Sequence, residues 1–535
     1  MSLNNSLKII YPIIIGSFAA LTYYIGSNQS LSNNNREQFN QKDKLQHIMS
    51  IIENRYVDST DKNLLIENSI IGMLEELDPH STYIPKKKVA QANESLQGHF
   101  GGVGIRFIIL RDTLMITEAI YGGPSYNAGL KFGDRILSVD DEDIAGINLN
   151  IQGVLDRLKG KQGTKVKLET YNINTKQTQI TQINRGAISI PSIDASYMID
   201  NNIGYIKLSS FSGQTSINIP ITINELKKLG MTKLILDLRD NGGGYLFGAV
   251  SVADEFLESD KLIVYTEGLH QDRNSKFATP QGVFEKGDLV ILVNSNSASA
   301  SEIVSGAIQD NDRGYIIGRR TFGKGLVQQP ITLEDSSELR LTISRYFTPT
   351  GRCIQKPYGE GVDYNNELYK RYTNGEMQEI DSNVFLSQNK FTTPKGKTVY
   401  GGGGIFPDIF IPIDTSRYSN SYAELLYSPS FRNFSFDYVY NNYNNLQFKD
   451  IYNFSTNFNI SEEILEDFLK YAKNDLNINL IKSDIIKDKK HIENRLKADI
   501  SSYLFGTNAR YFISLDYDED FKAAMNYLLY LKNGI

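Results

Sequence analysis

The sequence predicts an α/β domain that lies between a β-rich module and a helical C-terminal region. Strand and helix patterns alternate over residues 203–350, short β-like runs with glycine turns fill residues 96–186, and helical patterns recur beyond residue 416. The chain has 535 residues, of which 40% are hydrophobic, so it holds enough apolar material for real cores. This length predicts about three to four domains.

Composition excludes several classes of protein. Lysine and arginine number 56 against 62 acidic residues, a net charge of −6 with no long basic run, which gives no indication of nucleic-acid binding. A single cysteine, Cys353, rules out an intramolecular disulfide and any zinc or iron–sulfur site built from several cysteines. The five histidines are His47, His80, His99, His270 and His491. Any chemistry must therefore use few imidazoles.

Residues 1–42 read as a membrane segment followed by a polar linker. Residues 9–26 carry no charge and follow Lys8, and at 1.5 Å per residue these 18 residues can just span a hydrocarbon core. The alternatives are a cleaved export signal and a buried helix, but residues 17–19 form a poor cleavage signal and residues 27–42 are polar. We therefore expect an exported protein of the cell envelope or periplasm, anchored to the membrane by residues 9–26.

Residues 43–95 form a predicted N-terminal helical region. Apolar residues recur there at intervals of three and four, which is the helical period. They are Leu45, Ile48, Ile51, Ile52, Leu64, Ile70, Ile71, Leu74 and Leu77. Asp78-Pro79 then ends the helical pattern.

Residues 96–186 form a predicted β-rich module with one helix. A glycine loop precedes a strand pattern, residues 123–130 contain an Ala-Gly-Leu turn, and residues 133–139 read Gly-Asp-Arg-Ile-Leu-Ser-Val. Together these motifs resemble a PDZ domain, an α+β fold, in which the loop amides bind a carboxylate and the next strand adds a peptide strand. The alternative is an ordinary turn-rich β domain. The loop residues are Gly101, Gly102, Val103, Gly104 and Ile105.

Residues 187–415 form the predicted α/β core with a β-rich extension. Its strands, at 204–208, 234–238, 262–266, 289–293 and 315–318, alternate with helices at 217–229, 245–257 and 300–309. A glycine-rich loop, residues 237–244, follows the second strand, and residues 326–348 predict two strands joined through residues 334–337. Residues 416–535 form a mostly helical C-terminal region whose role stays open, with packing on the core, dimerisation and binding of an adaptor as alternatives.

The stretch Asn294–Ile303 contains three serines that alternate with alanine. It follows an apolar strand and opens a helix, so a serine there is placed at a strand-to-helix turn close to free backbone N–H groups. That geometry suits a nucleophile with an oxyanion site. Helix capping is the alternative reading, but one cap needs only one of the three serines.

Lys324 lies between two glycines in Thr321-Phe322-Gly323-Lys324-Gly325, just before a predicted strand. A buried lysine loses its charge because desolvation disfavours the ammonium form, and a neutral lysine can accept a serine proton. An exposed turn is the alternative. A phosphate-binding loop fits poorly, because the G-x-x-x-x-G-K-[ST] spacing is absent and a strand follows.

These motifs, in this order, resemble the C-terminal processing (tail-specific) serine peptidases. The matching segments are S-A-S-A-S-E-I, Q-D-x-x-R-G, T-F-G-K-G-x-V-Q, D-L-R-x-N-x-G-G and L-D-P-H-S-T-Y-I-P. The resemblance covers residues 45–415 and implies a crotonase/ClpP-like α/β catalytic core with an inserted PDZ domain. It also implies that no cofactor and no metal are required.

The resemblance assigns roles to the matching positions. Ser299 becomes the nucleophile, Lys324 the general base and Gln328 the residue that orients the lysine. The backbone N–H groups of Ala300 and of one glycine in 242–244, placed at Gly243, become the oxyanion donors. Asp310 is a possible accessory residue, or else a helix-terminal partner of Arg313. We expect Asp237 and Arg239 to brace the glycine loop, and Ser297, Ser301 and His80 to be structural.

The expected function is that of a serine endopeptidase that captures the C-terminal tails of proteins through its PDZ domain and cleaves through an acyl-enzyme. The expected partners are protein or peptide substrates with accessible C-termini and the membrane, with no nucleic acid, and with a homo-oligomer or an adaptor as further possibilities. Two other classes stay open. They are a non-catalytic PDZ scaffold or chaperone and a crotonase-like acyl-transfer enzyme.

Overall fold

A computed structural model describes residues 16–24, 44–172, 175–379, 389–413 and 418–530. Its contacts separate residues 1–77 from residues 78–535. The first unit contains α2 (Lys44–Arg55) and α3 (Lys62–Glu75), which confirms the helical prediction for this region. The Asp61 carboxylate caps α3 by accepting the N–H groups of Asn63 and Leu64.

The predicted membrane segment, residues 9–26, lies partly outside the described residues. Its described part, residues 16–24, is helical. Over the stretches that the structure describes, no helix is both long enough and apolar enough to span a bilayer.

The PDZ-like module is an antiparallel sheet in the order β3-β4-β5-β7-β8, with β6 paired to β5. The helix α6 contributes Val154 and Leu158 to the apolar core of the module. The strand β3 lies at the edge of the sheet, which leaves its outer hydrogen-bonding groups available to a further strand. The elements are β3 (Ile105–Leu110), β4 (Thr113–Ala119), α5 (Pro124–Asn127), β5 (Arg135–Val139), β6 (Glu142–Asp143), α6 (Ile151–Leu158), β7 (Lys165–Asn172) and β8 (Gln177–Asn184).

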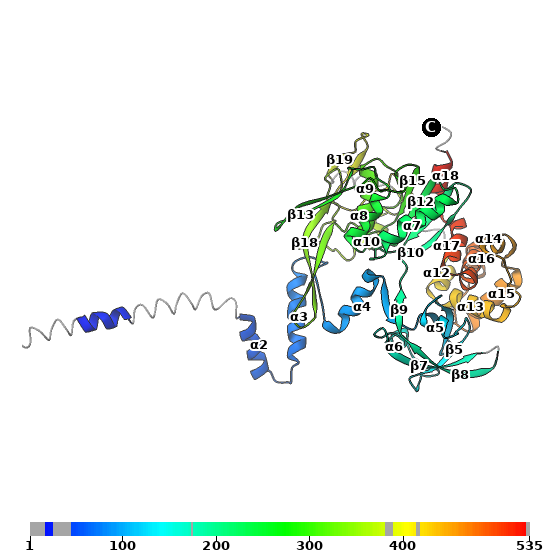
Figure 1. Cartoon of the computed structure of the whole chain (residues 1–535), viewed down its shortest axis with the longest axis horizontal. Coiled ribbons are helices and arrows are strands. Elements are labelled where there is room, and N and C mark those ends of the chain that lie inside the picture. The colour runs from blue at the N-terminus through cyan, green and yellow to red at the C-terminus, as the bar shows by residue number, and fades with distance from the viewer. Residues whose placement is uncertain (1–15, 25–43, 173–174, 380–388, 414–417, 531–535) are drawn as a thin grey trace, which may run out of the picture. The chain divides into compact units, whose positions relative to one another are not determined.

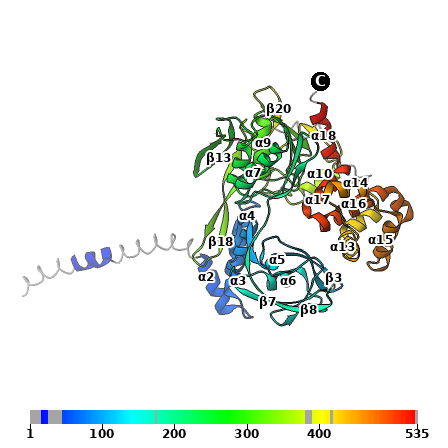
Figure 2. The same ribbon diagram turned by 45° about the vertical axis from the view of Figure 1, so that its right-hand side comes forward.

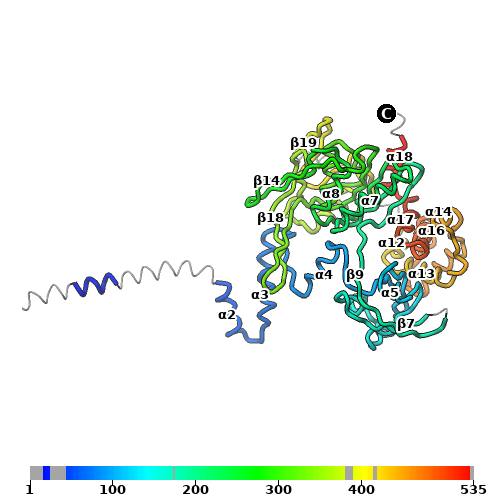
Figure 3. Tube along the Cα trace, in the orientation of Figure 1, coloured from blue at the N-terminus to red at the C-terminus, as the bar shows by residue number. Residues whose placement is uncertain are grey.

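Two paired strands join this module to the core. The helix α4 (Lys86–Gln97) leads into β2 (His99–Gly102), by which the chain enters the module, and the chain leaves by β9 (Gly186–Ser189). These two strands pair antiparallel, with Phe100 opposite Ile188. Figure 3 traces the chain from α4 into the module and back out along β9.

The core is a six-stranded sheet in the order β10-β11-β12-β15-β16-β21, parallel except at β10. Its inner strands are nearly continuous apolar runs because both of its faces are covered. The helices α7, α8 and α9 pack on one face (Figure 1). The elements are β10 (Ile193–Met198), β11 (Ile203–Leu208), α7 (Thr215–Lys228), β12 (Lys233–Asp237), α8 (Leu246–Asp254), β15 (Asp288–Val293), α9 (Ala300–Asp310), β16 (Tyr315–Gly318) and β21 (Ile409–Phe410).

A second sheet extends the core and holds the strand that follows Lys324. It has the order β1-β18-β13-β14, with β17 paired to β18, and thus confirms the two strands predicted over residues 326–348. The elements are β1 (Thr82–Ile84), β13 (Leu262–Gly268), β14 (Gln271–Phe277), β17 (Leu326–Thr332) and β18 (Glu338–Phe347), followed by α10 (Glu367–Thr373) and the hairpin β19 (Lys390–Thr392) with β20 (Thr398–Tyr400).

The C-terminal region is helical, as predicted, and most of it forms one bundle (Figure 2). Its last helices leave the bundle and cover the second face of the six-stranded sheet, where Phe521 and Leu528 pack against Val290 and Leu292. The elements are α12 (Asn420–Tyr427), α13 (Ser430–Asn442), α14 (Ile451–Asn457), α15 (Glu462–Asn474), α16 (Lys482–Phe505), α17 (Thr507–Ser514), η1 (Leu515–Tyr517) and α18 (Glu519–Tyr530).

Candidate active site

Ser299 lies immediately before α9, at the turn that follows β15. Its backbone has φ 55° and ψ −111°, a conformation that residues with a side chain seldom adopt. Two contacts hold this strained turn. The N–H of Ser299 donates to Oε2 of Glu302 at 2.8 Å, and its carbonyl accepts the hydroxyl of Tyr346 at 3.1 Å.

The flanking serines are structural, as the sequence predicted. Ser297 donates its hydroxyl to the carbonyl of Leu238 at 2.8 Å, and Ser301 donates to the carbonyl of Asn241 at 2.8 Å. Both serines are fully buried. Their hydrogen bonds hold the turn around Ser299 against the glycine-rich loop that follows β12.

Lys324 lies in the loop between β16 and β17. Burial lowers the pKa of its ammonium group, and this effect outweighs the carboxylates of Glu302 and Asp78, which raise the pKa. The preceding Gly323 has φ +89°, and a Cβ there would lie 3.1 Å from Cβ of Lys356, so the backbone before the lysine is tightly confined.

Glu302, which was not predicted from the sequence as a site residue, connects the turn at Ser299 with the loop that contains Lys324. Its carboxylate is fully buried and accepts four hydrogen bonds. The donors are Thr321 Oγ1 at 2.5 Å, Gly323 N at 2.7 Å, Lys324 N at 2.9 Å and Ser299 N at 2.8 Å. Burial raises the pKa of Glu302 to about 7, while these hydrogen bonds act in the opposite direction. The signal was present in the sequence, because Ser299 and Glu302 have capping-box spacing.

Tyr346 of β18 makes a second connection between the same segments. Its buried hydroxyl contacts the carbonyl of Lys324 at 2.6 Å as well as the carbonyl of Ser299 at 3.1 Å. The backbones of the two predicted catalytic residues are therefore tied together twice, by a carboxylate and by a phenol.

Ser299 and Lys324 line one cavity of about 650 Å³. Of the other predicted site residues, Ala300 and Gln328 line it too, as do Gly242 and Gly244 of the glycine-rich loop. The chain thus brings together predicted site residues from Gly242 to Gln328, which are 86 positions apart in the sequence.

Gly243 lies against the serine turn, but its N–H group has a partner within its own loop. It donates to Oδ1 of Asn241 at 2.9 Å. Gly243 has φ +103°, and a Cβ at this position would lie 2.8 Å from Cβ of Ser299. Only glycine fits here without displacing Ser299.

Gln328 belongs to a hydrogen-bond chain that leads away from Lys324. Its Nε2 donates to Oγ1 of Thr342 at 3.1 Å, and Thr342 donates to Oδ1 of Asp78 at 3.0 Å. Asp78 also accepts the hydroxyl of Ser81 at 2.6 Å. Through Thr342, the Asp-Pro-His-Ser motif therefore fixes the side-chain amide of Gln328.

His80 lines the cavity as well, a position that the sequence analysis did not anticipate. Its Nε2 lies 2.8 Å from the hydroxyl of Tyr364. Burial lowers the pKa of His80 to about 4, and the nearby Lys324 contributes in the same direction. The imidazole is therefore neutral at physiological pH.

Asp310, the possible accessory residue, does not line this cavity. It pairs with Arg352 at 2.6 Å, both side chains being fully buried, and it also accepts the hydroxyl of Thr350 at 2.7 Å. Arg313, the alternative partner, instead donates to the backbone carbonyls of Phe256, Gly287 and Phe284.

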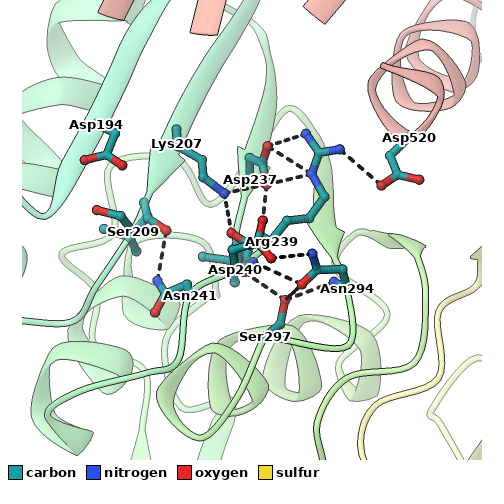
Figure 4. Close-up of polar contacts among 12 residues, drawn as sticks. Asp194, Lys207, Ser209, Asp237, Arg239, Asp240, Asn241, Asn294, Ser297 and Asp520 are labelled. Carbon is teal, nitrogen blue, oxygen red and sulfur yellow. Dashed lines mark hydrogen bonds and ion pairs between the residues drawn. The ribbon is translucent and has the colours of Figure 1, made fainter. Parts of the chain in front are cut away.

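Asp237 and Arg239 brace the glycine-rich loop, as predicted (Figure 4). The guanidinium of Arg239 pairs with the buried carboxylate of Asp237 at 2.6 Å. Asp237 also accepts the hydroxyl of Tyr205 at 2.7 Å and pairs with Lys207 at 3.2 Å. These positive partners lower the pKa of Asp237 despite its burial.

The predicted loop of the PDZ-like module joins β2 to β3. Gly101 and Gly102 end β2, Val103 and Gly104 are buried, and Ile105 begins the edge strand β3. The carbonyl of Val103 accepts both the N–H and the hydroxyl of Ser125. Over the described part of the chain, no group of three or more His, Cys, Asp or Glu side chains could hold a metal ion.

Comparison with known proteins places these features in one family. Residues 202–368 match peptidase family S41, residues 115–172 match a PDZ domain, residues 16–88 match the N-terminal domain of the activating protease CtpB, and residues 421–506 match a family of unknown function, DUF8443.

A carboxy-terminal-processing protease of Bartonella bacilliformis is 34% identical over 353 residues, which cover 65% of this chain and 80% of that protein. The carboxy-terminal processing protease CtpA of Bacillus subtilis is 32% identical over 359 residues, which cover 66% of this chain and 76% of that protein. A solved structure of the photosystem II D1 C-terminal processing protease is 29% identical, covers 56% of this chain and 81% of its own, and has a TM-score of 0.34. The chain therefore belongs to the carboxy-terminal processing proteases of peptidase family S41, and it is a serine peptidase that carries a PDZ domain.

Proposed function

We propose that this peptidase cleaves its substrates with a Ser299–Lys324 dyad through an acyl-enzyme. The observation that carries the proposal is the double connection by Glu302 and Tyr346, which holds the backbones of the two residues at the wall of one cavity. The lowered pKa of Lys324 supports its role as base, because a larger fraction of the lysine is then neutral at physiological pH.

In the proposed first step, neutral Lys324 takes the hydroxyl proton of Ser299 as Oγ bonds to the carbonyl carbon of the substrate. The carbonyl π electrons move to oxygen and form a tetrahedral oxyanion. Collapse of this intermediate breaks the C–N bond, and Lys324 gives its proton to the leaving amine. A water molecule, deprotonated by Lys324, then attacks the ester and releases the acyl group with recovery of the serine.

Backbone amides would stabilise the oxyanion. The N–H of Ala300 is at the first position of α9, where a helix offers no internal acceptor and the helix dipole favours negative charge. The second donor would come from residues 242–244. Gly242 and Gly244 line the cavity, whereas the N–H of Gly243 would have to leave Asn241 to serve.

Gln328 would orient the base. Because its amide nitrogen donates to Thr342, its carbonyl oxygen is the end left to accept a hydrogen bond from Lys324. The hydrogen bonds that run from Gln328 through Thr342 to Asp78 would then determine which end of the Gln328 amide faces Lys324.

The PDZ domain would capture the C-terminal tail of a protein substrate. The edge position of β3 allows a peptide to add as a further strand, and the loop Gly101–Ile105 leads into that strand. The full-length Ser299→Ala variant should bind a fluorescent peptide with a free, apolar C-terminus and should lose most of that affinity when the same peptide is amidated. Equal affinity for both peptides would contradict tail capture.

We also propose that the protein is exported and held at the membrane by residues 9–26, since this uncharged stretch follows a cationic end. Carbonate extraction of membranes from cells that express the full chain should leave the protein in the pellet. Its release into the supernatant would contradict the anchor.

Cleavage itself is tested with the full chain and an unfolded protein that bears an apolar C-terminus. Ser299→Ala, Lys324→Ala and Lys324→Arg should all abolish cleavage, because a permanently charged arginine cannot accept the serine proton. Persistent cleavage by Lys324→Ala would refute the dyad. Tail binding without cleavage by the wild type would favour a scaffold, and turnover of an acyl-CoA thioester would favour a crotonase-like enzyme.

A further inference from the structure

The end of the chain forms a C-terminal arm, η1 and α18 (residues 515–530), that packs on the catalytic core. Leu515, Phe521, Ala524 and Leu528 are buried against the face of the six-stranded sheet opposite to α7, α8 and α9. The arm lies outside residues 202–368, which match the peptidase family, and outside the helical match at residues 421–506.

Two carboxylates of the arm reach the guanidinium of Arg239. Asp518 pairs with it at 2.7 Å and Asp520 at 3.1 Å. Asp520 is 6% exposed and also pairs with Arg319 at 2.8 Å, through both of its carboxylate oxygens. Figure 4 shows Asp520 pointing from its helix toward Arg239, on the side of the guanidinium away from Asp237.

The charges of this cluster balance only when the arm is included. Its cations are Lys207, Arg239 and Arg319, and its anions are Asp237, Asp518 and Asp520. Without the two arm carboxylates, Arg319 would lose its ion pair, and Lys207 and Arg239 would share Asp237, with Asp194 and Asp240 as the other carboxylates along the same cavity. Burial of unpaired charge is strongly unfavourable, so Arg239 would have to move toward water or take up a different anion.

A shift of Arg239 would reach the serine turn through the next residues of the loop. Asp240 exchanges two hydrogen bonds with Asn294, at 3.0 and 2.9 Å, and accepts a third from Asn296 at 2.8 Å. The carbonyl of Asn241 accepts the N–H of Ala298 at 3.0 Å and the hydroxyl of Ser301. These contacts connect the loop with residues on both sides of the nucleophile.

We propose that Asp518 and Asp520 are positioning residues of the peptidase, which hold Arg239 and thereby the loop that forms the oxyanion site beside Ser299. The inference rests on the function proposed above and assigns the C-terminal arm to the catalytic apparatus. Loss of the two carboxylates should weaken binding of the tetrahedral oxyanion and leave tail capture by the PDZ domain unchanged.

The test compares Asp518→Asn, Asp520→Asn and the double variant with Glu519→Gln in the full chain. Glu519 is a matched control, because it lies between the two aspartates and pairs with Lys522 on an exposed surface. We expect kcat to fall about 10- to 100-fold in the double variant, as expected for small displacements at a reacting centre. Glu519→Gln should stay near the wild-type rate, and Asp520→Glu should recover part of the loss.

Two further readouts separate positioning from a general loss of structure. Affinity for a peptide aldehyde, which adds to Ser299 and places an oxyanion among the loop amides, should fall by the same factor as kcat. Affinity for a free C-terminal peptide should not change. If the double variant fails to fold, the single Asp518→Asn variant, whose carboxylate is 21% exposed, serves in its place.

Wild-type kcat and wild-type aldehyde affinity in a folded variant that lacks both carboxylates would overturn the inference. A proportional loss in Glu519→Gln would overturn it as well. Failure of the proposed function has a different signature, because Ser299→Ala would then keep its activity in the same assay. A dead Ser299→Ala variant beside fully active aspartate variants would refute the role of the arm alone.

Discussion

Replacement of Glu302 by glutamine tests whether one buried carboxylate organises the dyad. The substitution keeps the side-chain volume but leaves a single acceptor oxygen. Oε1 accepts from Thr321 and Gly323, and Oε2 accepts from Ser299 and Lys324, so two of the four donors lose their acceptor whichever way the amide is turned. The amide NH₂ would then face two N–H or O–H donors.

The expected stability change is modest because two effects oppose each other. A hydrogen bond to a charged group contributes about 1.5–3 kcal/mol, so the loss of two costs about 3–6 kcal/mol. Removal of the buried charge acts in the opposite direction, because it abolishes the desolvation cost that raises the pKa of Glu302 to about 7. The free energy of unfolding should therefore fall by less than the about 3–6 kcal/mol that the lost hydrogen bonds alone would cost.

Catalysis should fall as well, because among the described residues no other side chain accepts hydrogen bonds from the N–H groups of both Ser299 and Lys324. Loss of one such hydrogen bond corresponds to about a 10- to 100-fold fall in kcat. Peptide cleavage at pH 8.5 and urea unfolding followed by tyrosine fluorescence measure the two quantities. Glu255→Gln is the control, since burial also raises the pKa of Glu255 but its carboxylate accepts from Val283, outside the cavity. Wild-type kcat in Glu302→Gln would refute the reasoning.

Three further predictions follow from the same geometry. Because burial lowers the pKa of Lys324, activity should fall as acidification through that lowered pKa protonates the base, and a rate independent of pH between 5 and 9 would contradict a lysine base. Gly243→Ala should reduce kcat at least about 100-fold, because its Cβ would lie 2.8 Å from Cβ of Ser299. Labelling of Ser299 by a fluorophosphonate measures the loss. Normal labelling would contradict the close approach of residue 243 to Ser299. Thr342→Val should lower kcat about 10-fold and move the acidic limb of the pH profile, because it removes the acceptor that orients the amide of Gln328. Thr342→Ser should restore both kcat and the pH profile. An unchanged pH profile in Thr342→Val would contradict a role of Gln328 in orienting Lys324.

The fold could be predicted, and the dyad could be proposed, because their signals are local. Apolar runs bounded by glycine indicated the parallel strands, and the hairpin over residues 326–348 was read from its turn. Ser299 and Lys324 each stand in a distinctive motif, and the family resemblance put both in one site. The structure adds the cavity that both residues line.

What could not be predicted depends on contacts between distant segments. The capping-box spacing of Glu302 indicates at most a helix end, whereas three of its four hydrogen-bond partners belong to the loop between β16 and β17. In the sequence, His80 directly follows Asp78-Pro79, which ends a helical pattern, yet the side chain of His80 lines the cavity. The pairing of Asp520 with Arg239 joins positions 281 residues apart, and neither residue type carries a local signal for such a contact.

The proposed lysine base would explain why this site needs so much buried polar structure. A histidine titrates near neutrality in water, whereas a lysine must be desolvated before it is neutral at physiological pH. Desolvation of the lysine also buries the peptide groups around it, and each buried N–H needs an acceptor. Glu302 supplies four acceptor positions in one side chain, and the cost of its own burial appears as its raised pKa. The carboxylate that satisfies the buried amides also raises the pKa of Lys324, so burial must be deep enough to outweigh it. The proposed dyad therefore requires that the turn at Ser299, the loop at Lys324 and the glycine-rich loop be held by other groups. The proposed role of the C-terminal arm extends this requirement to the carboxylates at the start of α18.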